Sequence, residues 1–196
     1  MPGPLHGVRV LDFTGNLSGP YLTMQLADLG ADVLKLERPG SGDPSRGTPP
    51  YVEGLSTYFA SINRGKRSLV VDLKQAEGVE LTLKIAEHCD VLVENFLPGT
   101  MERLGLGYES VRARNPRIVY ASCSGFGQTG PDAKKPAYDI IVQGSAGTMS
   151  INGDPDRPPT RVGFSVGDIA AGLFGALSVV AALRERDASE IGRAHV

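Results

Sequence analysis

The sequence predicts an α/β fold in which helices cover both faces of a parallel sheet. Two observations lead to this prediction: apolar runs of strand length alternate with helix-length segments, and glycine-rich loops directly follow the strand-like runs. Of the 196 residues, 41% are hydrophobic and 21% are charged, which is typical of a globular domain. The length suffices for one hydrophobic core or for part of a larger protein.

The first half of the sheet is predicted from two strand-like runs that flank a helix. Residues 8–13 (VRVLDF) are expected to form the first strand, and residues 32–36 (DVLKL) the second. Between them, residues 21–30 carry leucine and methionine at helical positions, and Gly30 is a suitable C-terminal stop. The strand–helix–strand order favours parallel pairing of the two strands.

The second half of the sheet repeats this pattern. Residues 68–73 are expected to form a third strand, and a helix is expected over residues 77–88. A fourth strand is expected over residues 90–94 (DVLVE) and a fifth over residues 116–122 (PRIVYAS). Five parallel strands with helical crossovers are therefore predicted.

The last helix is predicted over residues 169–183, an almost uninterrupted apolar run that is too short to cross a bilayer. We expect it to be a buried core helix. Asp168 stands directly before the run. A carboxylate at a helix start lies beside free N–H groups and the positive end of the helix dipole, which favours its ionised, nucleophilic form. An ordinary N-cap role is the alternative.

The loops after the strands are the expected ligand site, because ligands of parallel sheets bind outside the carboxyl ends of the strands. These loops span residues 14–20, 37–47, 95–99 and 122–131. Their glycines allow backbone amides to approach a bound ligand closely. The first loop also leads into a helix N-terminus, which suits a phosphate or a carboxylate.

Basic and aromatic side chains near these loops suit a phosphorylated ligand. Arg38 and Arg46 carry guanidinium groups that bind phosphate in a bidentate manner, and Lys66 and Arg67 form a basic cluster. A solvated surface is the alternative for each of them. Phe96 is expected either to stack on an adenine or to pack on the protein.

Composition disfavours several classes of function. A net charge of −2 gives no indication of a nucleic-acid or membrane partner. Cys89 and Cys123 fit a reducing compartment, and with no leader-like start a cytoplasmic location is expected. The histidines and cysteines lack metal-ligand spacing, so no metal is expected. Gly15 and Gly19 do not complete G-x-G-x-x-G, and Pro20 removes an amide, which disfavours a nicotinamide dehydrogenase.

Seven motifs in this order resemble those of the family III coenzyme A-transferases, a group that includes formyl-CoA:oxalate and carnitine CoA-transferases. They are VLDFTG with SGP (10–20), LGADVLKLERPGSGDPSRG (29–47), NRGKRSLVVDLK (63–74), DVLVENFLPGTMERLGLG (90–107), SGFGQTGP (124–131), PAYDIIVQGSAG (136–147) and VGDIAAG (166–172). The resemblance implies a Rossmann-like large domain, of which residues 1–188 are an incomplete part. It also implies a small domain that is missing here, and an interlocked homodimer.

The resemblance further implies which residues form the site. The nucleophile falls on Asp168, and nothing beyond coenzyme A or acyl-CoA, as substrate, is expected as a cofactor. The CoA-binding positions fall on Thr14, Gly15, Asn16, Leu17, Ser18, Arg38, Val71, Asn95, Phe96, Arg103 and Tyr138. Some members carry histidine and glutamine where this chain has Gly15 and Leu17, so the formate/oxalate substrate pair does not follow.

The expected reaction moves CoA from an acyl-CoA to an acceptor carboxylate through an aspartyl acyl anhydride and an aspartyl-CoA thioester. Amides of the glycine loops are expected to stabilise the oxyanions. Acyl-CoA racemases of the same fold are one alternative, but their histidine base is replaced by Tyr138, and a neutral phenol is a poor base near neutral pH. A non-catalytic CoA-binding fragment is another alternative.

The end of the chain departs from the resemblance. After Arg186, family members continue with a glycine-rich turn, another strand and a long further segment. Residues 190–196 are therefore expected to be a non-native tail in which His195 has no role. The chain is expected to be a fragment with little or no transferase activity, because an open site admits water that would hydrolyse an anhydride.

Overall fold

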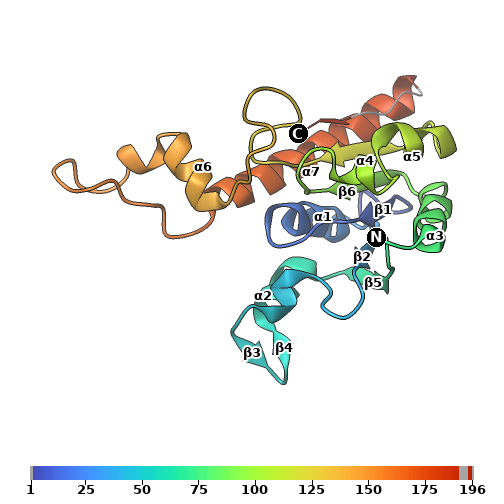
Figure 1. Ribbon diagram of the computed structural model, residues 1–196, viewed down its shortest axis with the longest axis horizontal. Helices are drawn as coiled ribbons and strands as arrows, with labels where there is room; N and C mark the ends of the chain where they lie inside the picture. Colours follow the sequence, from blue (N-terminus) through green and yellow to red (C-terminus); the bar gives the residue numbers. More distant parts are fainter. Residues whose placement is uncertain (1, 190–193, 196) are drawn as a thin grey trace.

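The predicted α/β architecture is confirmed by a computed structural model, which describes residues 2–189 and 194–195 (Figure 1). Its sheet is entirely parallel. In spatial order, the strands are β5 (Lys66–Val70), β2 (Asp32–Glu37), β1 (Arg9–Asp12), β6 (Val91–Glu94), β7 (Val119–Ser122) and β8 (Ala194–His195). The chain order reverses between β1 and β6, which makes their carboxyl ends the topological switch point where such sheets bind ligands.

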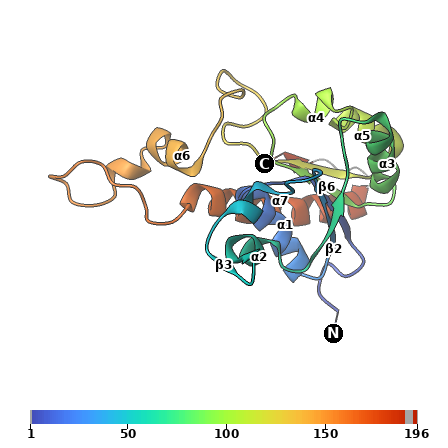
Figure 2. The same cartoon turned by 60° about the horizontal axis from the view of Figure 1, so that its bottom comes forward.

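Helices cover both faces of the sheet, as predicted. On one face, α1 (Ser18–Asp28) and α7 (Val166–Ser189) lie side by side (Figures 1 and 2). The other face carries α3 (Ala76–Ala86), α4 (Thr100–Arg103) and α5 (Tyr108–Arg114). Each face therefore has its own hydrophobic core.

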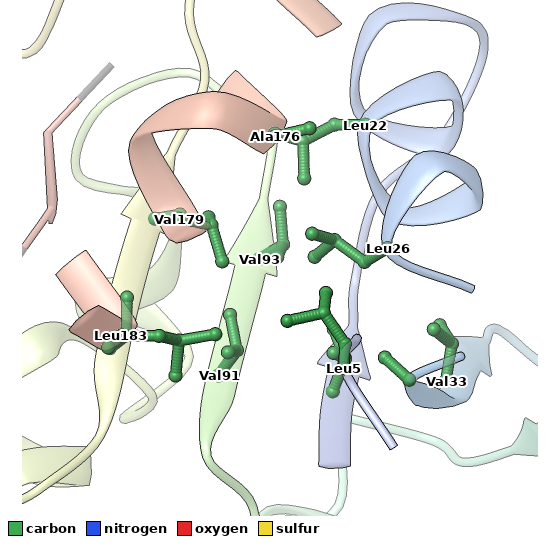
Figure 3. Close-up of a cluster of buried hydrophobic side chains, with 13 residues drawn as sticks. Leu5, Leu22, Leu26, Val33, Val91, Val93, Ala176, Val179 and Leu183 are labelled. Carbon is green, nitrogen blue, oxygen red and sulfur yellow. The ribbon is translucent and has the colours of Figure 1, made fainter. Parts of the chain in front are cut away.

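The central strands are apolar on both faces, as expected for a covered parallel sheet. Successive residues of β6 alternate between the two cores. Val91 and Val93 meet the α1 and α7 side, where Leu26 and Val179 pack (Figure 3), and Leu92 joins the α3 and α5 side. All five of these side chains are fully buried.

The boundaries of the predicted elements shift by a few residues. The five predicted strands are all present, with ends displaced by no more than three residues, close to the usual uncertainty of such boundaries. Helix α1 begins at Ser18 rather than residue 21, because Pro20 is tolerated in the first turn of a helix. It ends as predicted, since Gly30 follows with a positive φ of 100°.

Several short elements were not predicted. They are the hairpin β3 (Tyr51–Val52) and β4 (Leu55–Ser56), the strand β8, the helices α2 (Thr57–Asn63), α4, α5 and α6 (Asp139–Ser145), and two 3-10 helices (Pro44–Gly47 and Thr148–Ser150). None of these segments is long enough to show apolar residues repeating at a regular helical or strand spacing, which is the main signal of secondary structure in a sequence.

The prediction for the last helix was wrong in length and in burial. Helix α7 has 24 residues, and by length and composition alone it could cross a membrane. Val179 and Leu183 are buried against the sheet, whereas Phe174 and Leu177 are 66% and 63% exposed. Only one face of α7 is therefore covered in this chain. Packing of that face on the sheet explains why residues such as Val179 and Leu183 are apolar, but it does not explain the apolar residues on the exposed face.

The expectation of a non-native tail falls mostly outside the described residues, which omit 190–193 and 196. The described pair Ala194–His195 forms β8, whose backbone lies in parallel register with Ala121 and Ser122 of β7.

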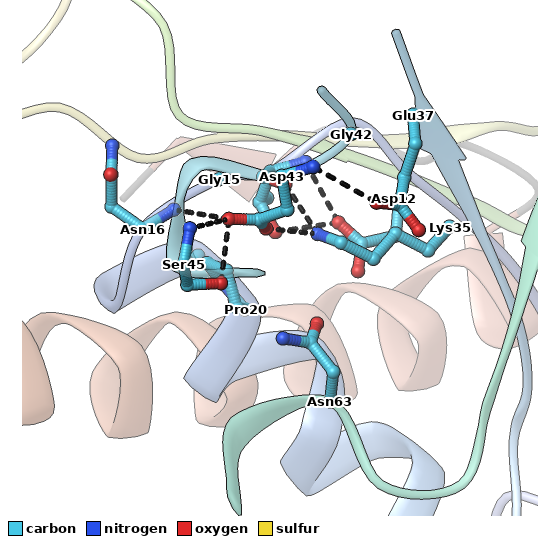
Figure 4. A network of polar contacts seen from close by, with 12 residues as sticks. Asp12, Gly15, Asn16, Pro20, Lys35, Glu37, Gly42, Asp43, Ser45 and Asn63 are labelled. Carbon is cyan, nitrogen blue, oxygen red and sulfur yellow. Dashed lines mark hydrogen bonds and ion pairs between the residues drawn. The ribbon is translucent and has the colours of Figure 1, made fainter. Parts of the chain in front are cut away.

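A buried network of charges lies under the loops that follow β1 and β2 (Figure 4). The carboxylate of Asp12 accepts hydrogen bonds from the Thr14 amide (2.8 Å) and from the Thr14 and Thr23 hydroxyls (2.6 and 2.7 Å). It also pairs with the ammonium of Lys66 at 3.1 Å. Burial alone would raise the pKa of Asp12, but Lys66, a second lysine and the two hydroxyls outweigh it and hold the pKa at about 2.

The second lysine joins the two loops. Lys35 Nζ donates to the Thr14 carbonyl at 2.6 Å and pairs with Asp43 at 2.8 Å. The amide of Asp43 in turn donates to Glu37 (2.9 Å). Burial again opposes ionisation of Glu37, but two short hydrogen bonds from Arg46 and others from its surroundings lower its pKa to about 2. The loops are thus fixed by groups that must stay charged.

Acid should therefore destabilise the protein. The pKa values of Asp12 and Glu37 are lower in the folded state than their ordinary values of roughly 4, so the unfolded chain binds more protons between pH 2 and about 4. This contribution to stability is fully present above about pH 5 and is lost as the pH falls toward 2. Urea midpoints measured by circular dichroism between pH 2 and 7 should show the decline.

The variant Asp12→Asn separates this network from general acid effects. It should be less stable at pH 7 by about 3–5 kcal/mol, because Lys66 loses its buried partner, and its stability should depend less on pH. The exposed Asp156→Asn is the matched control and should follow the unmodified protein. An equal pH dependence in all three proteins would contradict the assignment.

Candidate functional site

Two cavities open at the carboxyl ends of the strands, where the sequence predicted the site. The larger, cavity one, measures about 320 Å³ and lies among the loops that follow β1, β2, β5 and β6. The smaller, cavity two, measures about 200 Å³ and lies between the β1 and β7 loops and the start of α7. Asn16 and Asn95 line both cavities, which are therefore neighbours.

Most of the predicted site residues line one of these cavities. Cavity one receives Thr14, Gly15, Asn16, Arg38, Val71, Asn95 and Phe96. Cavity two receives Asn16, Leu17, Ser18, Asn95, Tyr138 and Asp168. Arg103 lines neither cavity: it is exposed, and its guanidinium donates to the Thr100 hydroxyl at 2.9 Å. The fold thus collects eleven of the twelve predicted positions from six separate segments.

Asn95 holds the wall between the two cavities. Its Oδ1 accepts the Gly15 amide at 2.9 Å, and its Nδ2 donates to the Gly15 carbonyl at 2.8 Å. Asn16 has a left-handed φ of 66°, which asparagine tolerates better than most residues. A Cβ at Gly19 would lie 2.5 Å from Thr14 and 3.0 Å from Asn95, so only glycine fits there. The loop from Thr14 to Ser18 is therefore fixed before any ligand binds.

Cavity one has an apolar interior and a basic edge. Val71 is 7% exposed, and Phe96 is half-buried against the core, so the packing alternative for its ring is observed. At the edge stand Arg38 and Lys74, both exposed. Arg38 Nε donates to the Gly42 carbonyl at 3.1 Å, and within the described part of the chain its other N–H groups meet no acceptor. Such an arrangement suits a flat apolar group inside and an anion at the mouth.

Three of the basic residues predicted to bind phosphate are engaged elsewhere. Arg46 pairs with Glu37 through two hydrogen bonds of 2.6 Å, and its guanidinium lies 3.8 Å above the Phe59 ring. Lys66 is buried against Asp12. Arg67 pairs with Asp32 at the opposite, amino end of β2. The prediction was wrong for these residues, because partners distant in sequence neutralise each charge.

Asp168 lies in cavity two, half-buried in the first turn of α7. It is the third residue of the helix and not its N-cap, so the alternative N-cap role is wrong. The net shift is opposite to the one expected from the helix field alone: burial raises the pKa of Asp168, and the nearby charge of Asp139 raises it further. Loss of solvation and a like charge both oppose ionisation of a carboxylate.

The other walls of cavity two carry no charge and combine hydroxyl groups with amide and apolar side chains such as Leu17 and Val142. Ser18 and Ser124 line it, and a Cβ at Gly125 would lie 2.1 Å from the Ala137 Cβ, which leaves room for no side chain. Tyr138 is 73% exposed. Apart from Asp168, a carbonyl group in this cavity would meet no charged side chain.

Two residues near Asp168 were not predicted to belong to the site. The first is Asp139, which precedes a short apolar run in the sequence, as Asp168 precedes a longer one. This pattern is the only feature of the sequence that could have indicated Asp139. The second is Tyr58 of α2, whose pKa is raised by burial and then by the charge of Asp168. No local pattern in the sequence connects Tyr58 with the site. Among the described residues, no group of three histidine, cysteine, aspartate or glutamate side chains could hold a metal ion.

Comparisons with known proteins agree with this geometry. A model of CoA-transferase family III matches residues 5–194. The chain is 47% identical to a succinyl-CoA:glutarate CoA-transferase of Mus musculus, covering 93% of this chain and 42% of that protein. It is 48% identical to an acetyl-CoA:oxalate CoA-transferase of Acetobacter aceti, covering 99% of this chain and 50% of that protein. The chain thus spans about half the length of these curated relatives.

Solved structures show the same fold. A CaiB/BaiF family protein from Brucella suis superposes with a TM-score of 0.94 at 40% identity, over 100% of this chain and 53% of that one. A protein from Mycobacterium tuberculosis gives a TM-score of 0.93 at 40% identity, over 100% of this chain and 55% of that one.

The clamp formed by Asn95 can be tested by truncation. Asn95→Ala removes both hydrogen bonds to Gly15 and leaves the part-buried amide and carbonyl of Gly15 unpaired. The substitution should therefore lower the free energy of unfolding by about 1–3 kcal/mol. Asn152→Ala is a matched control, because its exposed side chain makes a single hydrogen bond to Thr160, and it should change stability by less than about 0.5 kcal/mol. Equal losses in urea unfolding would refute the clamp.

Proposed function

The chain belongs to CoA-transferase family III, and from that premise we propose that the whole protein moves CoA from an acyl-CoA to an acceptor carboxylate. One observation carries the proposal: the carboxylate of Asp168 faces a cavity that adjoins a larger, apolar cavity with a basic edge. A ligand that fills both cavities must pass between the loops held by Asn95. An elongated molecule with an anionic end and a reactive end fits this arrangement.

Cavity one is the proposed site for the nucleotide end of coenzyme A. Its apolar walls, including Val71 and Phe96, suit an adenine ring. Arg38 and Lys74 stand at its edge, where they can meet phosphate groups without first breaking an ion pair. The thioester would then lie in cavity two beside Asp168.

The proposed chemistry begins with attack of Asp168 on the thioester carbonyl. The C–S bond breaks, CoA leaves as the thiolate, and a mixed anhydride remains on the aspartate. The thiolate then attacks the aspartyl carbonyl, which releases the first acid and leaves an aspartyl-CoA thioester. The acceptor carboxylate displaces the thiolate to form a second anhydride. Attack of the thiolate on the acceptor's carbonyl gives the new acyl-CoA and frees the carboxylate of Asp168.

The surroundings of Asp168 support this role. Nucleophilicity rises with basicity, and both burial and Asp139 make this carboxylate more basic. The loop with Ser124 and Gly125 approaches the same cavity, so that its backbone amides are the proposed donors to the tetrahedral oxyanions.

The substrates are proposed from the relatives. Their names specify glutarate, oxalate and mesaconate as acceptors or partners of succinyl-CoA and acetyl-CoA. Since these acceptors are dicarboxylic acids, we propose that this protein also uses a small dicarboxylic acid and its CoA thioester. A cytoplasmic location is part of the proposal, supported by the two free cysteines Cys89 and Cys123.

The remaining half of the family's length, and a second copy in a homodimer, are the proposed cover for cavity two and for the exposed face of α7. Support comes from the exposure of Tyr138, Phe174 and Leu177. We propose that the 196-residue chain alone has little or no transferase activity, because water entering an uncovered site would hydrolyse the anhydride.

The nucleophile can be tested in the whole protein. Asp168→Ala should abolish CoA transfer and leave the affinity for CoA nearly unchanged, because the carboxylate acts on the acyl carbon and not on the nucleotide. Initial rates and calorimetry measure the two effects, and trapping with hydroxylamine should label Asp168 only in the unmodified protein. Retained turnover would remove the assignment. Exchange of the α-proton with solvent deuterium, without transfer, would instead support the racemase.

The phosphate site can be tested with a matched pair of arginines. Arg38→Ala should weaken binding of CoA by about tenfold or more, because a charge-assisted contact is lost. Arg67→Ala removes the same charge at the opposite end of the sheet, where Asp32 holds it, and should leave affinity unchanged. Calorimetry with CoA and with dephospho-CoA would show which phosphate is involved. Equal effects of the two variants would disprove the location.

A further inference from the structure

The first turn of α7 is attached to α6 through a buried carboxylate. Asp139, the first residue of α6, is 8% exposed. Its Oδ1 accepts the Gly167 amide at 2.8 Å, and its Oδ2 accepts the Gln143 side-chain amide at 2.6 Å. Amides in the first turn of a helix have no acceptor within the helix. Asp139 supplies that acceptor from another helix.

Gln143 makes this attachment rigid. It is 1% exposed and lies one turn after Asp139 in α6. Its Oε1 accepts the Val162 amide at 2.8 Å, and its Nε2 also reaches the Phe164 carbonyl at 3.4 Å. The segment that enters α7 is therefore bound to α6 at three positions along the backbone.

There is little free space at this contact. A Cβ at Gly167 would lie 3.1 Å from Asp139 Oδ1 and 3.3 Å from the Val142 side chain. Figures 1 and 2 show α6 and the start of α7 extending together beyond the edge of the sheet. The sheet therefore does not support this turn directly, and α6 does. Since Asp168 follows Gly167 in the chain, its carboxylate is placed by this attachment.

We propose that Asp139, held by Gln143, is a positioning residue that fixes the first turn of α7 and so aims the carboxylate of Asp168 into cavity two. The inference rests on the proposed role of Asp168 as the nucleophile. A second effect goes with it: after burial, the charge of Asp139 is the cause of the raised pKa of Asp168. One buried carboxylate thus both orients the other and makes it more basic.

Two other groups that interact with Asp168 have a raised pKa and therefore stay uncharged near neutral pH. Tyr58 of α2 and Cys123, which follows β7, both have a pKa raised by burial and, further, by the charge of Asp168. Tyr138, which precedes α6, contributes a phenol to the wall of cavity two. Among the described residues, Asp139 is the charged group whose interaction with Asp168 raises the pKa of Asp168, so a shift in that titration would be assigned to it.

The test follows the Asp168 side-chain carboxyl carbon by NMR against pH in the ¹³C-labelled 196-residue chain, assigned with Asp168→Asn. Asp139→Asn removes the charge at nearly constant shape and should move the titration of Asp168 down toward that of an ordinary aspartate. Gln143→Met removes the supporting amide and should make exchange of the Gly167 amide hydrogen about tenfold faster. The exposed Asp156→Asn makes the same charge change as Asp139→Asn and should alter neither signal.

The proposal is overturned if Asp139→Asn folds and changes neither the titration of Asp168 nor the exchange of Gly167. If that variant does not fold, the test uses the unmodified chain. The chemical shift of the Gly167 amide must then change with pH as Asp139 titrates, and a chemical shift that stays constant would refute the contact. In the whole protein, Asp139→Asn should lower kcat and shift its pH profile with little change in KM for acyl-CoA. The NMR readouts need no turnover, so they remain interpretable if Asp168→Ala shows that the proposed function is wrong.

Discussion

The ammonium group of Lys35 is the contact on which the larger cavity depends most. It lies in the interior and touches both the Thr14 carbonyl and Asp43, so the loops after β1 and β2 meet at one buried charge. Asp12 and Lys66 form a second buried pair beside it. A buried charge without its partner costs several kcal/mol, so neither loop can move away without a large penalty. Cavity one is therefore formed by the folded chain itself, before a ligand enters.

The topological switch point gives the site its second constraint. Because the chain crosses to opposite sides of the sheet after β1 and β6, the loops that follow them separate and leave room between them. Asn95 then joins the β6 loop to Gly15 by two hydrogen bonds. The space on either side of this wall becomes the two cavities. A proposed ligand as long as coenzyme A would use both, with its charged end beside Arg38 and its thioester beside Asp168.

Asp168 itself stands outside this framework. It is carried by the part of α7 that extends beyond the sheet, and α6 rather than a strand supports it. Helix α7 also exposes the apolar side chains of Phe174 and Leu177. Under the proposed function, the rest of the protein and a second copy would cover this face and exclude water from Asp168. Under the same proposal, this chain forms the cavity for the nucleotide, whereas the reacting carboxylate needs a cover from further structure.

The sequence by itself determined the architecture and the segments of the site. Strand-like runs such as DVLKL and DVLVE alternate with helical segments, and hydrophobic periodicity is a local property that needs no tertiary information. The loops after those runs were correctly expected to meet at one edge of the sheet. Their motifs also indicated the family, and placed Asp168 and Asn95 among the residues of interest.

Only the tertiary structure decided which charges are available and how Asp168 titrates. Arg38 and Arg46 look equivalent in the sequence, yet Arg46 is neutralised by Glu37 and Arg38 is not. The pKa of Asp168 is raised, against the direction expected from its place at a helix start, because its carboxylate is half-buried and because Asp139 lies nearby. Ion pairing and desolvation depend on distances between residues far apart in the chain, and no local pattern of residues contains those distances.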